Sequence, residues 1–301
     1  MRAIVTGGTG FLGSHLVRAL LAREDEVAVV VRPQSDRRRL DEVAARVVFL
    51  ETDSPDLARA AAAFAPESLF HLAWAGVHGA GRDDAHLLAT NLRHTVDVID
   101  LAEQAGCRVI VGVGSQAEYG RCTGVIDENT PTAPTTAYGI GKLAAGLLVE
   151  HTAGAHGMRG VWLRLLSAYG PMDEPSYLIP YMIGELLAGR RPKLSSGIQP
   201  HDTLYGPDVA DALRAAAVSE RCRGAYVLAA GEALGVREIA ALVEELVAPG
   251  PGVDFGAPAA HPGWRGSHRR LTEDTGWSPS TTLRVGLGET VLWYRRHGDH
   301  S

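Results

Sequence analysis

The chain has 301 residues, of which 46% are hydrophobic, and a formal net charge of −6 at pH 7. This length allows one or two domains with a large core, and the interspersed charges argue against a nucleic-acid groove or a basic membrane-binding patch. Three widely spaced cysteines without a CxxC pair argue against a zinc site, and the absence of a signal peptide or a membrane-length apolar stretch predicts a cytoplasmic protein.

Short runs rich in β-branched residues alternate with longer Ala/Leu-rich segments in the first half of the chain. The short runs are almost continuously apolar, which is typical of parallel strands covered on both faces. The alternation therefore predicts an α/β fold with a Rossmann-type, doubly wound parallel sheet. The predicted strands are 2–7, 26–31, 46–50, 68–73 and 108–113, and the predicted helices are 11–23, 56–64, 84–105 and 137–156.

The regular alternation is lost after residue 165. We expect a larger nucleotide-binding domain made of residues 1–165 and about 201–222. A smaller C-terminal, substrate-binding lobe would contain about 166–200 and 223–301. Further helices are predicted at about 179–188, 208–219, 236–247 and 284–297, with a strand at 225–230.

The stretch TGGTGFLG (6–13) follows the first predicted strand and opens a helix. Gly7 permits a sharp turn, Gly10 allows the backbone to approach a pyrophosphate, and Gly13 allows close packing of helix on strand. The free N–H groups at the start of the helix, beside Phe11 and Leu12, attract the anion. The turn therefore predicts a dinucleotide-binding site.

The end of the second strand indicates which dinucleotide is bound. NAD-binding folds usually carry an acidic residue about twenty positions after the glycines, whereas this chain has Arg32. Arginine matches a 2′-phosphate, and Ser35 or Arg37 can add contacts, so NADP(H) is predicted in preference to NAD(H). The alternative is that Asp36 curls back to the ribose.

The third predicted strand is followed by an acidic residue, Asp53. A carboxylate there can accept a hydrogen bond from the adenine amino group. The same residue could instead cap the next helix.

Tyr138 and Lys142 lie four residues apart on a predicted helix and so share one face. A neighbouring ammonium favours the phenolate and lowers the pKa of a tyrosine, which can then exchange protons with a carbinol or carbonyl. Ser115 ends the fifth strand, at the sheet edge where doubly wound folds bind ligands. These three residues are the predicted catalytic group.

In this order and spacing, the glycine turn, Ser115 and the Tyr138/Lys142 pair resemble the extended short-chain dehydrogenase/reductase superfamily. The resemblance is greatest to its sugar-nucleotide epimerase, dehydratase and ketoreductase branch. Further matching stretches are GSQAEYG (114–120), FHLAWAG (70–76), NLRHTVDVIDLA (91–102), LRLLSAYGP (163–171), HDTLYGPDVADAL (201–213) and TEDTGWSP (272–279).

The resemblance implies roles for several residues. Leu72 and Ala73 would belong to the cofactor loop, and Asn91 would be a structural residue of the cofactor site. Lys142 would also bind the nicotinamide ribose, and bound NADP⁺ would help to lower the Tyr138 pKa. The resemblance further implies a homodimer, formed through the helices at 84–105 and 137–156.

The chain departs from the dehydratase pattern STDEVYG, which places an acid–base carboxylate pair after the hydroxyl residue. Gln116 and Ala117 occupy those positions and cannot shuttle a proton, while Glu118 on a strand would face the other side. Dehydration is therefore disfavoured, and Gln116 becomes a candidate substrate contact.

Four more residues are candidate substrate contacts. Trp74 replaces a small residue near the nicotinamide and can stack on a substrate ring or pack under the loop. Ser167 replaces an asparagine and His201 an arginine, so Arg265 or Arg269 would supply the charge for a diphosphate. These departures leave open a differently bound nucleotide or none.

The predicted reaction is NADPH-dependent reduction of a keto sugar, at C4 of a nucleotide-linked 4-keto-6-deoxyhexose. Tyr138 would protonate the developing alkoxide, and Ser115 would hold it. Three alternatives stay open: a sugar-nucleotide 4-epimerase, a non-sugar ketone or aldehyde reductase resembling the dihydroflavonol-reductase branch, and a non-catalytic NADP-binding sensor.

Overall fold

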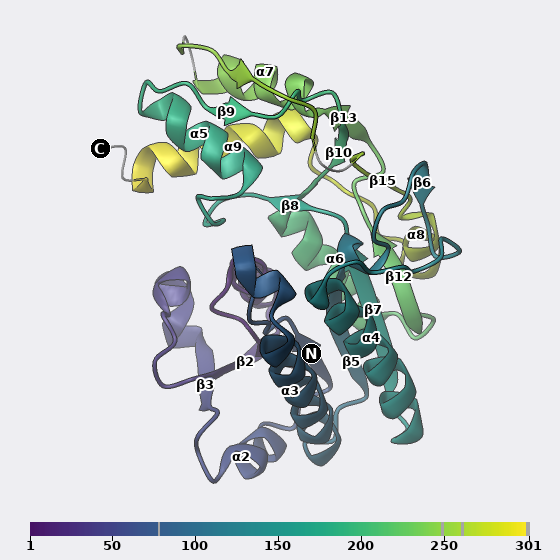
Figure 1. Ribbon diagram of the computed structural model, residues 1–301. Helices are drawn as coiled ribbons and strands as arrows, with labels where there is room; N and C mark the ends of the chain where they lie inside the picture. Colours follow the sequence, from purple (N-terminus) through teal and green to yellow (C-terminus); the bar gives the residue numbers. More distant parts are fainter. Residues whose placement is uncertain (78, 248–249, 260–261, 299–301) are drawn as a thin grey trace.

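The centre of the molecule is a seven-stranded parallel sheet (Figure 1). The computed structural model describes residues 1–77, 79–247, 250–259 and 262–298. The strand order is β12-β7-β5-β4-β1-β2-β3. The strands are β1 (Arg2–Thr6), β2 (Glu26–Val31), β3 (Val47–Glu51), β4 (Ser68–His71), β5 (Val109–Ser115), β7 (Arg159–Leu165) and β12 (Gly224–Leu228).

Helices cover both faces of the sheet because successive strand residues point to opposite sides. Val5 of β1 packs in the core with α1 (Phe11–Ala22) and α6 (Gly206–Val218). Ile4, its neighbour in sequence, packs on the other side. The helices on that side are α2 (Leu57–Phe64), α3 (Ala85–Gln104) and α4 (Ala137–Ala155).

The strand order reverses direction at β1: β2 and β3 follow on one side of it, and β4, β5, β7 and β12 on the other. In open α/β sheets, ligands bind outside the carboxyl ends of the strands at such a switch point. The predicted Rossmann-type α/β fold is therefore confirmed, and every predicted helix and strand ends within two residues of its predicted limits.

One strand of the sheet was not predicted. β7 carries Arg159 and Arg164, which interrupt its apolar pattern. Each arginine has partners far away in the sequence: Arg159 donates to the carbonyls of Ala217 and Cys222, and Arg164 pairs with Glu118. Long-range hydrogen bonds thus allow a charged segment to lie inside the sheet, between β12 and β5.

The C-terminal helices α5 (Leu178–Leu187), α7 (Val236–Val247) and α9 (Leu283–His297) share a separate apolar core. Figure 1 shows them grouped at the top of the view. β12 forms an edge of the main sheet, so the prediction that placed residues 223–228 with the C-terminal lobe is wrong for this strand. Its pairing with β7 decides this position. The rest of the two-domain division stays a prediction.

No described helix is long and apolar enough to span a membrane, and the described residues contain no metal-binding group of three or more His, Cys, Asp or Glu side chains.

The remaining elements of the structure are short. These elements are η1 (Arg38–Arg46), η2 (Gly79–Asp83), η3 (Gln116–Glu118), β6 (Val125–Ile126), β8 (Ala168–Tyr169), β9 (Lys193–Leu194), β10 (Pro200–Asp202), β11 (Leu204–Tyr205), β13 (Ala233–Gly235), β14 (Asp254–Phe255), β15 (Arg265–Gly266) and α8 (Arg269–Thr275).

Candidate active site

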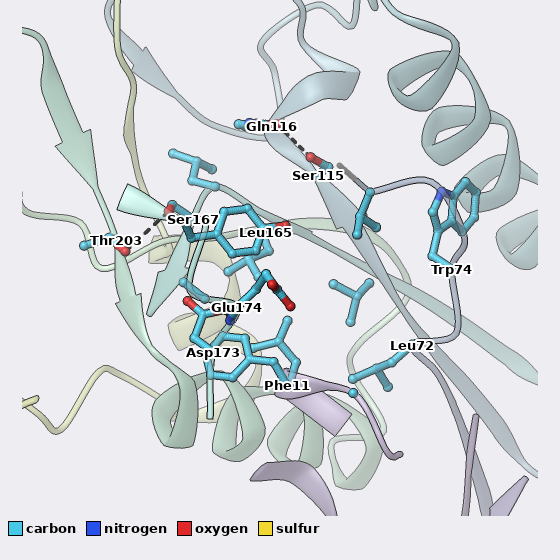
Figure 2. Close-up of a pocket in the computed structure, with 18 of the residues that line it drawn as sticks. Phe11, Leu72, Trp74, Ser115, Gln116, Leu165, Ser167, Asp173, Glu174 and Thr203 are labelled. Carbon is cyan, nitrogen blue, oxygen red and sulfur yellow. Dashed lines mark hydrogen bonds between the residues drawn. The ribbon is translucent and has the colours of Figure 1, made fainter. Parts of the chain in front are cut away.

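A cavity of about 550 Å³ lies at the carboxyl ends of β1, β4, β5 and β7. Figure 2 shows Leu72 and Trp74 on one side of it and Ser167 and Thr203 on the other. The predicted residues that line the cavity are Gly7, Gly10, Phe11, Leu12, Gly13, Leu72, Trp74, Ser115, Gln116, Tyr138, Lys142, Ser167 and His201. Those outside its lining are Arg32, Ser35, Arg37, Asp53, Ala73, Asn91 and Arg265.

The glycine turn has the backbone shape that a phosphate cradle requires. Gly7 has φ 71°, and a Cβ there would lie 2.5 Å from the Ala73 nitrogen. A Cβ on Gly13 would overlap the Gly7 carbonyl. Helix α1 begins at Phe11 without a side-chain cap, so its first N–H groups are available to an anion. The turn therefore fits a dinucleotide.

Asn91 anchors the loop after β4 rather than lining the cavity. Its side chain donates to the Ala75 carbonyl and accepts from the Ala75 nitrogen, both at 2.9 Å. The backbone N–H of Ala73 donates a hydrogen bond to Thr6 Oγ1 at 3.3 Å. These contacts hold Leu72 and Trp74 against the cavity.

The residues predicted to bind the 2′-phosphate or the ribose of the cofactor lie on the surface, outside the cavity lining. Arg37 pairs with Glu51 at 3.1 Å, and Asp36 pairs with Arg38 at 2.7 Å. The Ser35 hydroxyl accepts from the Arg32 backbone N–H at 3.1 Å. The Arg32 side chain is exposed, with no hydrogen bond or ion pair among the described residues. Its guanidinium is thus available, whereas the Asp36 carboxylate is already paired.

Asp53 is exposed in the turn after β3 and lies outside the cavity lining. It is not the cap of α2, because Asp56 occupies that position. The helix-cap alternative for Asp53 is therefore wrong, while its predicted contact with adenine stays a prediction.

Ser115, Tyr138 and Lys142 are brought together from β5 and the first two turns of α4. Thr136 caps this helix, accepting from the Gly139 N–H at 3.1 Å. The Ser115 hydroxyl donates to Gln116 Oε1 at 2.7 Å. Lys142 Nζ donates to the Val113 carbonyl at 2.8 Å and lies 4.0 Å from the centre of the Trp74 ring.

Burial raises the pKa of Tyr138 above its ordinary value, while a hydrogen bond with Ser115 and the charge of Arg82 lower it in part. The Arg82 guanidinium lies 4.3 Å from the centre of the Tyr138 ring. The prediction that Lys142 lowers this pKa is therefore wrong for the present arrangement, because the Lys142 amine is directed to Val113 and Trp74. The phenol keeps its proton at neutral pH.

Burial also lowers the pKa of Lys142 from 10.5 to about 7, and the charge of Glu118 opposes this shift. Between these pH values the unfolded chain holds a proton that the folded chain lacks, so the free energy of unfolding rises with pH. From pH 7 to pH 10, we expect the wild type to gain roughly 4 kcal/mol relative to Lys142→Met, measured by urea unfolding.

The matched control is Lys193→Met, because Lys193 is the other lysine of the chain and is exposed. Its stability curve should run parallel to that of the wild type. Parallel curves for Lys142→Met and wild type would contradict the assigned titration.

Glu118 occupies a 3₁₀ turn rather than the strand that was predicted. It is fully buried and outside the cavity lining. Its Oε1 accepts from the Ser115 backbone N–H at 2.8 Å and from Trp162 Nε1 at 3.0 Å, and its Oε2 pairs with Arg164 at 2.8 Å. Glu118 therefore supports the backbone of Ser115 and, as predicted, does not reach the cavity.

On the substrate side, His201 Nε2 lies 3.3 Å from Ser167 Oγ, and Thr203 donates to Ser167 Oγ at 3.4 Å. All three residues line the cavity. Arg265 is exposed on β15 and outside this lining, so the structure does not bring it to the cavity. The pairing of β15 with β6 places Arg265 in this position.

Trp74 lines the cavity and also contacts the catalytic candidates. Its ring lies edge-on to Tyr138, with 6.2 Å between the ring centres. The indole therefore packs against both Tyr138 and Lys142.

Sequence reasoning missed six polar residues of the cavity. The motif GPMDEPSY, which follows a stretch resembling the superfamily, was a signal for three of them. Arg39 and Arg82 lie in polar segments whose side-chain directions have no local signature. The missed residues are Arg39, Arg82, Asp173, Glu174, Tyr177 and Thr203.

Two curated proteins illustrate the similarity over nearly the whole chain. The dTDP-glucose 4,6-dehydratase of Streptomyces griseus is 28% identical, covering 98% of this chain and 94% of that protein. The UDP-glucose 4-epimerase of Mycolicibacterium smegmatis is 29% identical, covering 98% of this chain and 99% of that protein.

Two solved structures with bound NAD are also similar. The UDP-glucose 4-epimerase of Thermus thermophilus has a TM-score of 0.85 at 28% identity, covering 98% of this chain and 99% of that one. The Bordetella bronchiseptica enzyme WbmG has a TM-score of 0.84 at 28% identity, covering 99% and 95%.

A family model covers most of the fold described above. The model for the NAD dependent epimerase/dehydratase family matches residues 3–229, from the first strand of the main sheet to its last. The chain is therefore an enzyme of the NAD dependent epimerase/dehydratase family, within the extended short-chain dehydrogenase/reductase superfamily.

Proposed function

We propose that the protein is an NADPH-dependent reductase of a nucleotide-linked keto sugar, acting on the C4 ketone of a 4-keto-6-deoxyhexose. The names of the relatives support a nucleotide-sugar substrate, since they include enzymes of dTDP-glucose and UDP-glucose. The cavity supports redox chemistry at a carbonyl, because Ser115, Tyr138 and Lys142 line it together with the glycine turn.

The observation that carries the proposal is that Ser115 and Tyr138 line the cavity together, while the turn that adjoins Ser115 presents no carboxylate to it. Positions 116 and 117 are Gln and Ala, and Glu118 is fully buried in its pair with Arg164. A reduction needs one proton donor for the new hydroxyl group, whereas expelling water needs a further acid–base group. Asp173 and Glu174 also line the cavity, but they belong to the loop after β8 and not to the turn beside Ser115, where the dehydratase pattern has its acid–base pair. This arrangement favours reduction over the dehydration named for several relatives.

Each group of residues in the cavity has its own role in the proposed reaction. The glycine turn and the N-terminus of α1 would hold the phosphates of the cofactor, and NADPH supplies the hydride when bound. Ser115 donates a hydrogen bond to the ketone oxygen, and Tyr138 protonates this oxygen as charge develops on it. Lys142 binds the nicotinamide ribose, as the resemblance implies, and Trp74, Gln116, Ser167 and His201 contact the sugar nucleotide.

Arg32 is the proposed determinant of NADPH preference because its guanidinium is exposed and available at the end of β2. We expect Arg32→Ala to weaken NADPH binding about 10- to 100-fold, the range for a lost hydrogen bond to a charged group. NADH binding should change less than twofold, because NADH lacks the 2′-phosphate. Fluorescence titration of both nucleotides measures this, and equal losses for the two would contradict the role.

A sugar-nucleotide 4-epimerase is the second candidate, favoured by the epimerases among the relatives and by their bound NAD. The same Ser115, Tyr138 and Lys142 would serve it. The non-sugar reductase and the non-catalytic sensor have less support, since the relatives are sugar-nucleotide enzymes and all three catalytic candidates line the cavity. The proposal also includes a cytoplasmic homodimer.

The test is spectrophotometric. Purified protein is titrated with NADPH and NADH, and a nucleotide-linked 4-keto-6-deoxyglucose is then added. The expected result is stoichiometric oxidation of NADPH with little response from NADH. A preparation that already contains nicotinamide and gives no net oxidation would instead assign the epimerase.

A further inference from the structure

The loop from Gly170 to Glu174 is fastened at three successive carbonyl groups. His15 Nε2 lies 3.0 Å from the Pro171 oxygen, and Arg39 Nε donates to the Met172 oxygen at 2.9 Å. Tyr294 donates to the Asp173 oxygen at 2.7 Å. The three side chains come from α1, η1 and α9, so elements far apart in the sequence fix one short loop.

The fastened loop is strained. Met172 has φ 66°, a left-handed conformation that a non-glycine residue adopts only at a cost. Strained backbone that its surroundings hold in place is concentrated at ligand-binding and catalytic sites. Here the three hydrogen bonds hold Met172 in this conformation and so fix the backbone of the next residue, Asp173.

Asp173 is a buried carboxyl group in the wall of the cavity. The residue is 4% exposed and lines the cavity, as do Glu174 and Phe11 (Figure 2). One carboxyl oxygen accepts from the Glu174 N–H at 2.8 Å, whereas the other is buried without a hydrogen-bond partner. Burial raises the pKa of this carboxyl to about 7. An unpartnered buried carboxyl destabilises the protein, which indicates that a ligand satisfies it.

The chemistry of this wall selects the ligand group. Asp173, the exposed Glu174 and Arg39 all line this part of the cavity, and the free Asp173 oxygen needs a hydrogen-bond donor, which an ionised phosphate does not have. A neutral hydroxyl group can donate a hydrogen bond to the free oxygen. In the proposed function, on which this inference rests, such groups occur on two sugar rings, the ribose of the dinucleotide and the hexose of the substrate.

We propose that Asp173 is a ligand-binding residue whose free carboxyl oxygen accepts a hydrogen bond from a sugar-ring hydroxyl in this cavity. The loop holds the carboxyl group in the cavity wall before the ligand arrives, and the ligand supplies the missing partner. A residue of this kind lowers the stability of the ligand-free protein and raises its affinity for the ligand.

The test compares Asp173→Asn with wild type at pH 8, where the wild-type carboxyl is mostly charged. The Tm of the ligand-free variant should rise, because a neutral amide is less costly to bury than an unpartnered carboxylate. Affinity should fall about 10- to 100-fold for one of two probes, NADPH or dTDP-glucose. A loss for NADPH alone assigns the ribose, and a loss for dTDP-glucose alone assigns the hexose.

Two further variants complete the experiment. Tyr294→Phe removes the hydrogen bond to the Asp173 carbonyl and keeps the Asp173 carboxyl group, so both Tm and the affinity for the same probe should fall. Glu220→Gln removes one exposed charge outside the cavity and should change neither. Unchanged affinity of Asp173→Asn for both probes, or a lowered Tm, overturns the inference. If the protein binds NADPH but no keto sugar oxidises it, the proposed reduction is contradicted. The binding comparison between Asp173→Asn and wild type can still be interpreted in that case.

Discussion

Replacing Tyr138 by phenylalanine is expected to lower kcat for keto-sugar reduction about 1000-fold, within the range for loss of a general acid. The raised pKa keeps the phenol protonated, so the hydroxyl group is the proton donor that this variant removes. The ring keeps its contacts with Trp74 and Arg82, which limits other effects of the substitution. Single-turnover oxidation of NADPH measures the change.

The control for Tyr138→Phe is cofactor affinity, which should stay within twofold of wild type in a fluorescence titration. This result would separate loss of proton donation from loss of binding. Undiminished turnover in the variant would contradict the mechanism. A wild-type protein that binds NADPH but turns over no substrate would favour the alternative of a non-catalytic NADP-binding sensor.

Glu118→Leu is expected to lower the free energy of unfolding by about 3–5 kcal/mol, the range for breaking a buried ion pair. The substitution leaves the Arg164 guanidinium, whose side chain is 11% exposed, without its carboxylate. It also removes the acceptor for the Trp162 indole and the Ser115 N–H. Urea unfolding at pH 7 gives the loss in stability.

A double-mutant cycle tests the origin of this loss. Arg164→Leu alone should also destabilise the protein, since it leaves the Glu118 carboxylate buried without its charged partner. The double variant should lose less stability than the sum of the two single variants, because neither charge is then left unpaired. Strict additivity would contradict a direct ion pair as the source of the effect. Glu118→Gln keeps an acceptor for Ser115 and should lose less than Glu118→Leu.

Much of the fold could be predicted from the sequence because its signals are local. The apolar runs at 2–7 and 26–31 read as buried parallel strands, and both are strands of the main sheet. The turn at 6–13 has a required backbone shape, so its glycines indicate its structure directly. The spacing of Tyr138 and Lys142 places them on one helical face whatever the rest of the fold does.

The tertiary structure alone decided the features that depend on distant partners. The charged β7 enters the sheet because Glu118, Ala217 and Cys222 satisfy its arginines. Arg82 approaches Tyr138, and Asp173 reaches the cavity, through loops whose side-chain directions follow no period. A local pattern reports how a segment alternates between buried and exposed positions. Which charge meets which partner depends on packing between segments, and no single segment carries that information.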